Sequence, residues 1–204
     1  MPDLPRHFAE TLAQLKLSDP AGDTWRDIEA RYGESGRHYH TLDHVADCLD
    51  QLAGTMHDTP LLRLALYYHD IICDPCGDNN ELLSARFATD SLTGLGLPDA
   101  KTAVVYDLIR ATDHGNSPPV PHSDLIRDID LAILGADPGD YDEYAIAIRR
   151  EYGWLPDHKF NRGRTNLLLH FLKRPAIYET REFHTRLEDQ ARHNLTNEIT
   201  RLRG

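Results

Sequence analysis

The sequence has only three cysteines, Cys48, Cys73 and Cys76, among its 204 residues. An odd number, with two of them close together, gives no sign of a disulfide framework and favours a reducing cytoplasm. The N-terminus has no basic stretch followed by an apolar one, and no apolar run approaches the length that spans a membrane. We therefore expect a cytoplasmic protein with no signal peptide and no membrane partner.

Basic residues are also few, since 33 Asp and Glu stand against 22 Lys and Arg and give a net charge of −11. This balance argues against a protein whose main task is to bind the phosphate backbone of a nucleic acid polymer. It is compatible with a small substrate, whose charge a metal ion and a few arginines can neutralise. The sequence leaves the oligomeric state open.

Internal repeats, low-complexity tracts and long polar linkers are absent, so we expect a single domain over residues 1–204. Strict two-residue alternation of apolar residues is hard to find, whereas helical spacing recurs between turn-rich segments. We predict an all-α bundle of roughly eight to ten helices. The clearest apolar series are Val45, Leu49, Leu52 and Met56 after a start at Thr41; Val104, Leu108 and Ala111; Tyr144, Ile148 and Tyr152; and Phe183, Leu187, Ala191, Leu195, Ile199 and Leu202.

The most informative motif is the pair His69-Asp70, which follows the apolar run Leu61–Tyr68. A histidine upstream, His44, and an aspartate downstream, Asp130, complete a set of two imidazoles and two carboxylates. Mixed nitrogen and oxygen donors suit a divalent cation of manganese, iron, cobalt, nickel or zinc, and such cations activate water. The sequence therefore predicts a metal centre.

The spacing of these residues gives expectations for their placement. His40 and His44 are four residues apart, so we expect both on one face of one helix. His69 and Asp70 diverge by roughly 100° on a helix, and both reach one ion most easily where that helix ends. Asp130 is expected to come from a later helix and to complete the site across the bundle.

The order His44, His69-Asp70, Asp130 resembles the HD superfamily of metal-dependent phosphohydrolases. Tyr39-His40-x-x-x-His44 is also similar to the motif that opens the metal site of cyclic-nucleotide phosphodiesterases, a branch of that superfamily. Over nearly the whole chain the pattern resembles a bacterial family described as predicted metal-dependent HD phosphohydrolases. That match is carried by Arg37-His38-Tyr39-His40, Asn80-Glu81 with Ser84-Ala85, Asp130-Leu131-Ala132-Ile133-Leu134-Gly135, Arg149-Arg150-Glu151-Tyr152 and Gly163-Arg164.

The resemblance implies an all-helical HD domain with His44, His69, Asp70 and Asp130 as metal ligands. Asp128 is an alternative to Asp130, and the Leu131 that follows favours Asp130. Asp70 can also bridge to a second ion such as magnesium, because two ions commonly clamp the attacking and leaving oxygens in phosphoryl hydrolysis.

Catalytic roles follow from the same resemblance. Asp70 is expected to act at the metal, and His40 to give the proton that the leaving oxygen needs, since the pKa of histidine lies near neutrality. The alternative for His40 is a packing side chain or one that supports a ligand.

Substrate binding is expected from Arg37, Arg149 and Arg164, because a guanidinium binds phosphate through two parallel hydrogen bonds. Surface salt bridging is the alternative for each arginine. Asn80 and Glu81 are expected to orient water or a ligand histidine, or else to cap the helix after the His-Asp loop.

These expectations define three functional hypotheses. The leading one is hydrolysis of a small phosphate ester, a nucleotide or related metabolite, by activated water. The second is a di-iron oxygenase, which requires His114 and His122 to join the site. The third is a non-catalytic protein that binds a metal or a nucleotide. Cys73 and Cys76 lack a second ligand pair at zinc-site spacing and are interpreted as free thiols.

Overall fold

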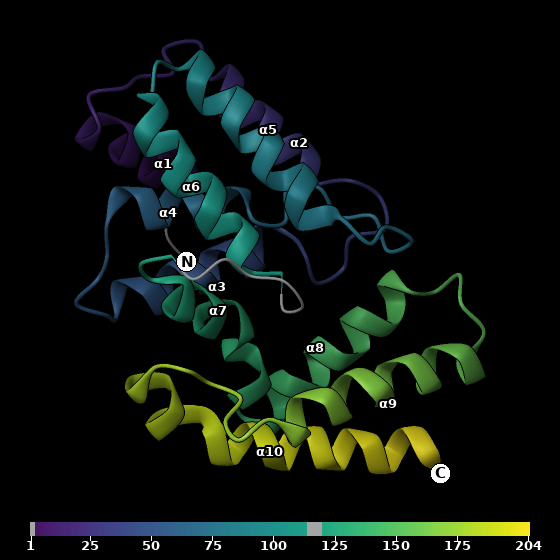
Figure 1. The fold of residues 1–204 in the computed structure, drawn as a ribbon. Coiled ribbons are helices and arrows are strands. Elements are labelled where there is room, and N and C mark those ends of the chain that lie inside the picture. Colours follow the sequence, from purple (N-terminus) through teal and green to yellow (C-terminus); the bar gives the residue numbers. More distant parts are fainter. Residues whose placement is uncertain (1–2, 114–119) are drawn as a thin grey trace. The chain divides into compact units, whose positions relative to one another are not determined.

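The computed structural model describes residues 3–113 and 120–204, and all regular structure in those two ranges is helical (Figure 1). The prediction of an all-α fold is therefore confirmed, with ten α-helices and one short 3₁₀-helix in the described residues. None of these helices is long and apolar enough to cross a membrane. The elements are α1 (Leu4–Gln14), α2 (Asp23–Tyr32), α3 (Leu42–Ala53), α4 (Pro60–Tyr68), α5 (Asn80–Gly94), α6 (Asp99–Ala111), α7 (Ser123–Asp130), η1 (Leu131–Gly135), α8 (Pro138–Glu151), α9 (Asp157–Lys173) and α10 (Arg181–Arg203).

The chain divides into two compact units, an N-terminal unit Met1–Ile126 and a C-terminal unit Arg127–Gly204, with the boundary inside α7. A domain can contain more than one compact unit, so a single domain over residues 1–204 stays a prediction.

Helix α4 is the core helix of the N-terminal unit, where it packs against α1, α3, α5 and α6. Thr59 caps its start by accepting a hydrogen bond from the backbone N–H of Leu62, and Pro60 occupies the first turn, where a missing N–H costs nothing. Leu62 and all residues from Leu64 to Tyr68, where α4 ends, are fully buried. The His69-Asp70 pair therefore directly follows a buried helix end.

Helix α3 packs against α4 and begins after Thr41, as the sequence predicted. Val45, Leu49 and Leu52 form its buried stripe. The prediction that Met56 continues this stripe is wrong, because α3 ends at Ala53 and Met56 is 96% exposed.

In the C-terminal unit, the long helix α10 packs against α9 and η1, and η1 also contacts α8 (Figure 1). The approach of η1 to α10 depends on Gly135. A β-carbon at Gly135 would lie 2.6 Å from Cβ of Leu187 and 2.8 Å from its carbonyl oxygen. Only a residue without a side chain fits there.

Candidate metal centre

Three of the four predicted metal ligands meet in the N-terminal unit. His44 projects from the first turn of α3, and His69 and Asp70 directly follow α4. The Nε2 atoms of His44 and His69 are 3.1 Å apart. Oδ2 of Asp70 lies 3.1 Å from Nε2 of His69 and 3.6 Å from Nε2 of His44. The side chains are 3%, 0% and 21% exposed for His44, His69 and Asp70.

These separations fit one divalent cation. Bonds of about 2.0–2.2 Å from a tetrahedral ion to nitrogen and oxygen place neighbouring donors about 3.3–3.6 Å apart. Octahedral bonds of about 2.1 Å place them about 3.0 Å apart. The three donor distances, 3.1, 3.1 and 3.6 Å, fall close to this range. Two imidazoles and a carboxylate are also the donors that first-row transition metals prefer.

His69 is held in the orientation that a metal ligand requires. Its Nδ1 lies 2.9 Å from the carbonyl oxygen of Leu66, and a carbonyl only accepts, so Nδ1 carries the proton. The lone pair is then on Nε2, the atom that faces His44 and Asp70. Ligand histidines commonly donate their other ring N–H to such a carbonyl.

Arg37 holds the backbone around the centre rather than facing outward for a phosphate. Nη1 donates to the carbonyls of Asp70 (2.6 Å) and His40 (3.2 Å), and Nη2 donates to the carbonyl of Ile71 (2.9 Å). Nε and Nη2 also face a carboxylate oxygen of Glu34 at 3.4 Å. All five N–H groups of the guanidinium are therefore directed at protein oxygens, and the side chain is 4% exposed. Phosphate binding by Arg37 stays a prediction without support from these contacts.

His40 does not share a helix with His44, so that expectation is wrong. Thr41 is the N-cap of α3, with extended backbone and a side chain that accepts a hydrogen bond from the N–H of Asp43. A residue before the N-cap lies outside the helix, and His40 sits in the preceding turn. Its ring centroid is nevertheless 5.9 Å from that of His44. The turn brings together the two rings that the helix was expected to align.

Cys48 is a residue at the centre to which the sequence interpretation gave no role. It lies one turn after His44 on α3, is buried, and its sulfur is 3.7 Å from Nε2 of His44. His44, Cys48 and His69 offer donor atoms that all lie within 4.8 Å of one another. The sequence does indicate this neighbour, because Cys48 follows His44 by four residues and a helix aligns side chains at that spacing.

Hydrogen bonds within the C-terminal unit bear on whether Asp128 or Asp130 is the fourth metal ligand. The buried carboxylate of Asp128 accepts hydrogen bonds from the N–H groups of Glu179 and Thr180 and from the Thr180 hydroxyl. Burial raises the pKa of Asp128, and these hydrogen bonds offset that effect only in part. Asp128 therefore holds the start of α10. Asp130 ends α7 in the same unit, so its role as fourth ligand stays a prediction.

The two other predicted phosphate-binding arginines also lie in the C-terminal unit and have protein partners. Arg149 donates to the carbonyls of Tyr152 and Leu155 and to the carboxylate of Asp157, which ties together the connection from α8 to α9. Arg164 is buried and its guanidinium pairs with the carboxylate of Glu198 at 2.9 and 3.2 Å. Both arginines have structural roles, and phosphate binding by either stays a prediction.

Asn80 and Glu81 begin α5. Oδ1 of Asn80 accepts a hydrogen bond from the N–H of Asp74, and its Nδ2 donates to the carbonyl of Asp74. Asn80 thus closes the loop after the His-Asp pair and makes no cap hydrogen bond to its own helix. Glu81 lies in the first turn of α5, where a carboxylate is favourable.

Within residues 3–113 and 120–204, neither His122 nor Cys76 belongs to a group of donors that could hold a metal ion. His114 lies outside the described residues. His122 is exposed and its ring is 5.2 Å from that of His57. Cys73 is half-buried and Cys76 exposed, and both are free thiols as predicted.

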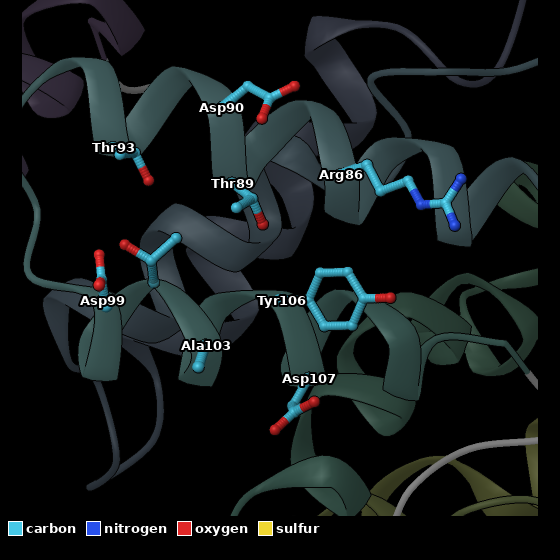
Figure 2. Close-up of a pocket in the computed structure, with 9 residues that line it drawn as sticks. Arg86, Thr89, Asp90, Thr93, Asp99, Ala103, Tyr106 and Asp107 are labelled. Atoms are coloured by element: carbon cyan, nitrogen blue, oxygen red, sulfur yellow. The ribbon is translucent and has the colours of Figure 1, made fainter.

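Figure 2 shows the residues that line a groove between α5 and α6 of the N-terminal unit. The volume of this groove is about 480 Å³. The groove carries three aspartates and one arginine, so its charge disfavours a phosphate ligand, and none of the predicted site residues lines it. The lining residues are Arg86, Thr89, Asp90, Thr93, Asp99, Thr102, Ala103, Tyr106 and Asp107.

Comparisons of this chain with protein-family models, with curated proteins and with solved structures found no match. The proposal that follows depends on the contacts described above and on the motif resemblance of the sequence.

Proposed function

We propose that this protein is a metal-dependent phosphohydrolase of the HD type, acting on a small phosphate ester such as a nucleotide or a related metabolite. The observation that carries the proposal is the convergence of His44, His69 and Asp70 at distances that fit one cation. Manganese, iron, cobalt, nickel and zinc suit this donor set. Asp130 is proposed as the fourth ligand on the motif resemblance, and a second ion such as magnesium can bind through Asp70.

A cation bound here polarises a phosphoryl oxygen and lowers the pKa of water, which is the chemistry that phosphoester hydrolysis needs. The chain supplies the rest. Arg37 fixes the backbone of Asp70 and of His40, so that the carboxylate of Asp70 and the imidazole of His40 keep their positions. His40 gives its proton to the leaving oxygen as the bond from phosphorus to that oxygen breaks. The oxygen of the attacking water forms the new bond to phosphorus and releases a proton to solvent. A cytoplasmic location, predicted from the small and odd number of cysteines, belongs to the same proposal.

The test is phosphate release from a panel of phosphomonoesters, phosphodiesters and nucleotides with added Mn²⁺, Co²⁺, Ni²⁺, Zn²⁺ or Mg²⁺. Removing a metal ligand is expected to lower kcat/KM by about 100-fold or more. His69→Ala and Asp70→Asn are the test variants, and His57→Ala, an exposed histidine of the same unit, is the matched control. If the test variants hydrolyse as fast as the parent protein, the proposed centre is wrong.

Elemental analysis of protein purified without a chelator accompanies this assay. One or two divalent ions per chain, lost in His69→Ala, support the proposal. Two irons together with oxygen uptake on substrate would replace it with an oxygenase, and tight nucleotide binding without turnover under any metal would replace it with a binding protein.

A further inference from the structure

The pair of imidazoles at the candidate metal centre has a carboxylate and a thiol as neighbours. Oδ2 of Asp70 is 3.6 Å from Nε2 of His44, and the sulfur of Cys48 is 3.7 Å from the same nitrogen. The side chains of Cys48, His44 and His69 are all buried, and their donor atoms form one group. Cys48 is therefore not an isolated thiol near a helix but a member of a donor cluster.

The sulfur of Cys48 lies 3.7 Å from Nε2 and 3.8 Å from Nδ1 of His44, so it rests against the face of the imidazole ring. A tetrahedral ion with a bond of about 2.3 Å to sulfur and about 2.05 Å to nitrogen holds the two donors about 3.6 Å apart. The observed 3.7 Å from Cys48 to His44 matches this value, and the 3.1 Å between the two imidazole nitrogens is close to the corresponding nitrogen separation. An ion on Nε2 lies in the plane of the ring, so the sulfur has to turn about the Cα–Cβ bond of Cys48 to bind it.

We infer that Cys48 is a ligand for soft divalent cations, together with His44 and His69. Thiolate sulfur favours zinc, cadmium and cobalt, whereas the Asp70 carboxylate favours manganese and magnesium. The cation thus selects between a sulfur-containing and an oxygen-containing ligand set around the same two imidazoles. On binding, a bond forms between the sulfur and the cation, and the thiol proton leaves to solvent. The inference rests on the metal centre of the proposed function but not on hydrolysis.

The test is a titration of metal-free, full-length protein with Co²⁺, followed by absorption spectroscopy. The protein carries Cys73→Ser and Cys76→Ser, so that Cys48 is its one remaining thiol. We expect visible d–d bands, which report Co²⁺ in the centre, and a sulfur-to-cobalt charge-transfer band in the near ultraviolet. Since this protein has one thiol, the band assigns the ligand even if a Cys48 variant fails to fold.

Adding Cys48→Ala to this background is expected to remove the charge-transfer band and keep the d–d bands. It should weaken Cd²⁺ binding by about 10-fold or more and leave Mn²⁺ binding unchanged. If the protein with Cys48 as its one thiol shows d–d bands but no charge-transfer band, Cys48 is not a ligand. The proposed function would then still stand. Absence of both bands would overturn the metal centre itself, and with it the proposed function.

Discussion

The guanidinium of Arg37 donates a 2.6 Å hydrogen bond to the backbone carbonyl of Asp70, the carboxylate residue of the candidate metal centre. The same group donates to the carbonyls of His40 and Ile71. The buried guanidinium of Arg37 therefore fixes both the turn before α3 and the segment after α4. These contacts give Arg37 a structural role, and phosphate binding by it stays a prediction.

Replacing Arg37 should weaken metal binding although the residue is not itself a ligand. Arg37→Gln leaves several carbonyls without a donor, which costs about 1–3 kcal/mol of stability for a buried group. Loss of support for a ligand typically lowers metal affinity by about 10–100-fold. Calorimetric titration with Mn²⁺ or Zn²⁺ measures the affinity. Arg6→Ala, which removes an exposed Arg6–Glu10 pair, is the control and should bind metal like the parent. Equal affinity in Arg37→Gln would show that the backbone needs no such support.

A second prediction concerns the buried pair Arg164–Glu198 of the C-terminal unit. Tyr141 donates a hydrogen bond to Glu198, and Arg164 donates to the hydroxyl of Tyr144. Burial alone would lower the pKa of Arg164, but Tyr144 and Glu198 outweigh it and raise that pKa, so the guanidinium stays charged. Removing one member of a buried ion pair costs about 3–5 kcal/mol.

Urea denaturation of Glu198→Ala should therefore show a free energy of unfolding lower by that amount. Arg201→Ala is the control, because its pair with Asp142 is about half exposed and such pairs contribute about 0–1 kcal/mol. A similar small loss in both variants would mean that Arg164 has no structural role, and phosphate binding would again be the better explanation for it.

The pH dependence of stability should contain a contribution from Glu188. Burial alone would raise its pKa, but the N–H groups of Ile177 and Tyr178 and the guanidinium of Arg192 outweigh burial and lower the pKa below its ordinary value of 4.5. A lowered pKa means that the folded protein favours the ionised carboxylate. The stabilisation is therefore complete above about pH 4.5 and is lost as the pH falls through the lower, folded-state value.

Chemical denaturation between pH 7 and pH 3 measures this effect on the parent and on Glu188→Gln. The variant should be less stable at pH 7 by about 1–3 kcal/mol, because it loses hydrogen bonds to a charged group. Its difference from the parent should shrink as the pH falls below 4.5. The exposed, neutral Thr185→Ala should keep a constant difference across the range. A constant difference for Glu188→Gln as well would contradict the prediction.

Two glycines of the C-terminal unit should respond to alanine in opposite directions. At Gly135 the new methyl would lie 2.6 Å from Cβ of Leu187, so η1 or α10 must move, at a cost of about 1–3 kcal/mol. At Gly163, inside α9, nothing lies within 4 Å of the new methyl, and alanine should stabilise the helix by about 0.5–1 kcal/mol. Thermal unfolding of both variants checks the signs, and a stabilised Gly135→Ala would show that the close contact relaxes freely.

Helix starts and the end of α4 could be predicted because their signals are local. Thr41 supplies a cap, and the apolar run that precedes His69 marks a buried helix. The same local signals show why two expectations failed. Thr41 as N-cap excludes His40 from the helix, and Gly54 after α3 removes Met56 from its buried stripe. In both cases a spacing rule was extended across a helix boundary.

The contacts of the candidate site were harder to predict, because they depend on partners distant in sequence. The oxygens that hold Arg37 are mostly backbone carbonyls, and a carbonyl leaves no mark in a sequence. Cys48 was overlooked because its significance depends on His69, which comes from another helix. The hydrogen bonds of Asp128 to the start of α10 join residues about fifty positions apart, and no local pattern of the sequence indicates them.

The hydrogen bond from Nδ1 of His69 to the carbonyl of Leu66 closes the last turn of α4. It satisfies one of the carbonyls that a helix leaves without a partner at its end. The rotational freedom of this imidazole is thus lost during folding, so the free energy of ion binding is not reduced by the entropy of ordering it. The centre is preorganised by its own secondary structure. Any change that frays the end of α4 should weaken affinity without touching a donor atom.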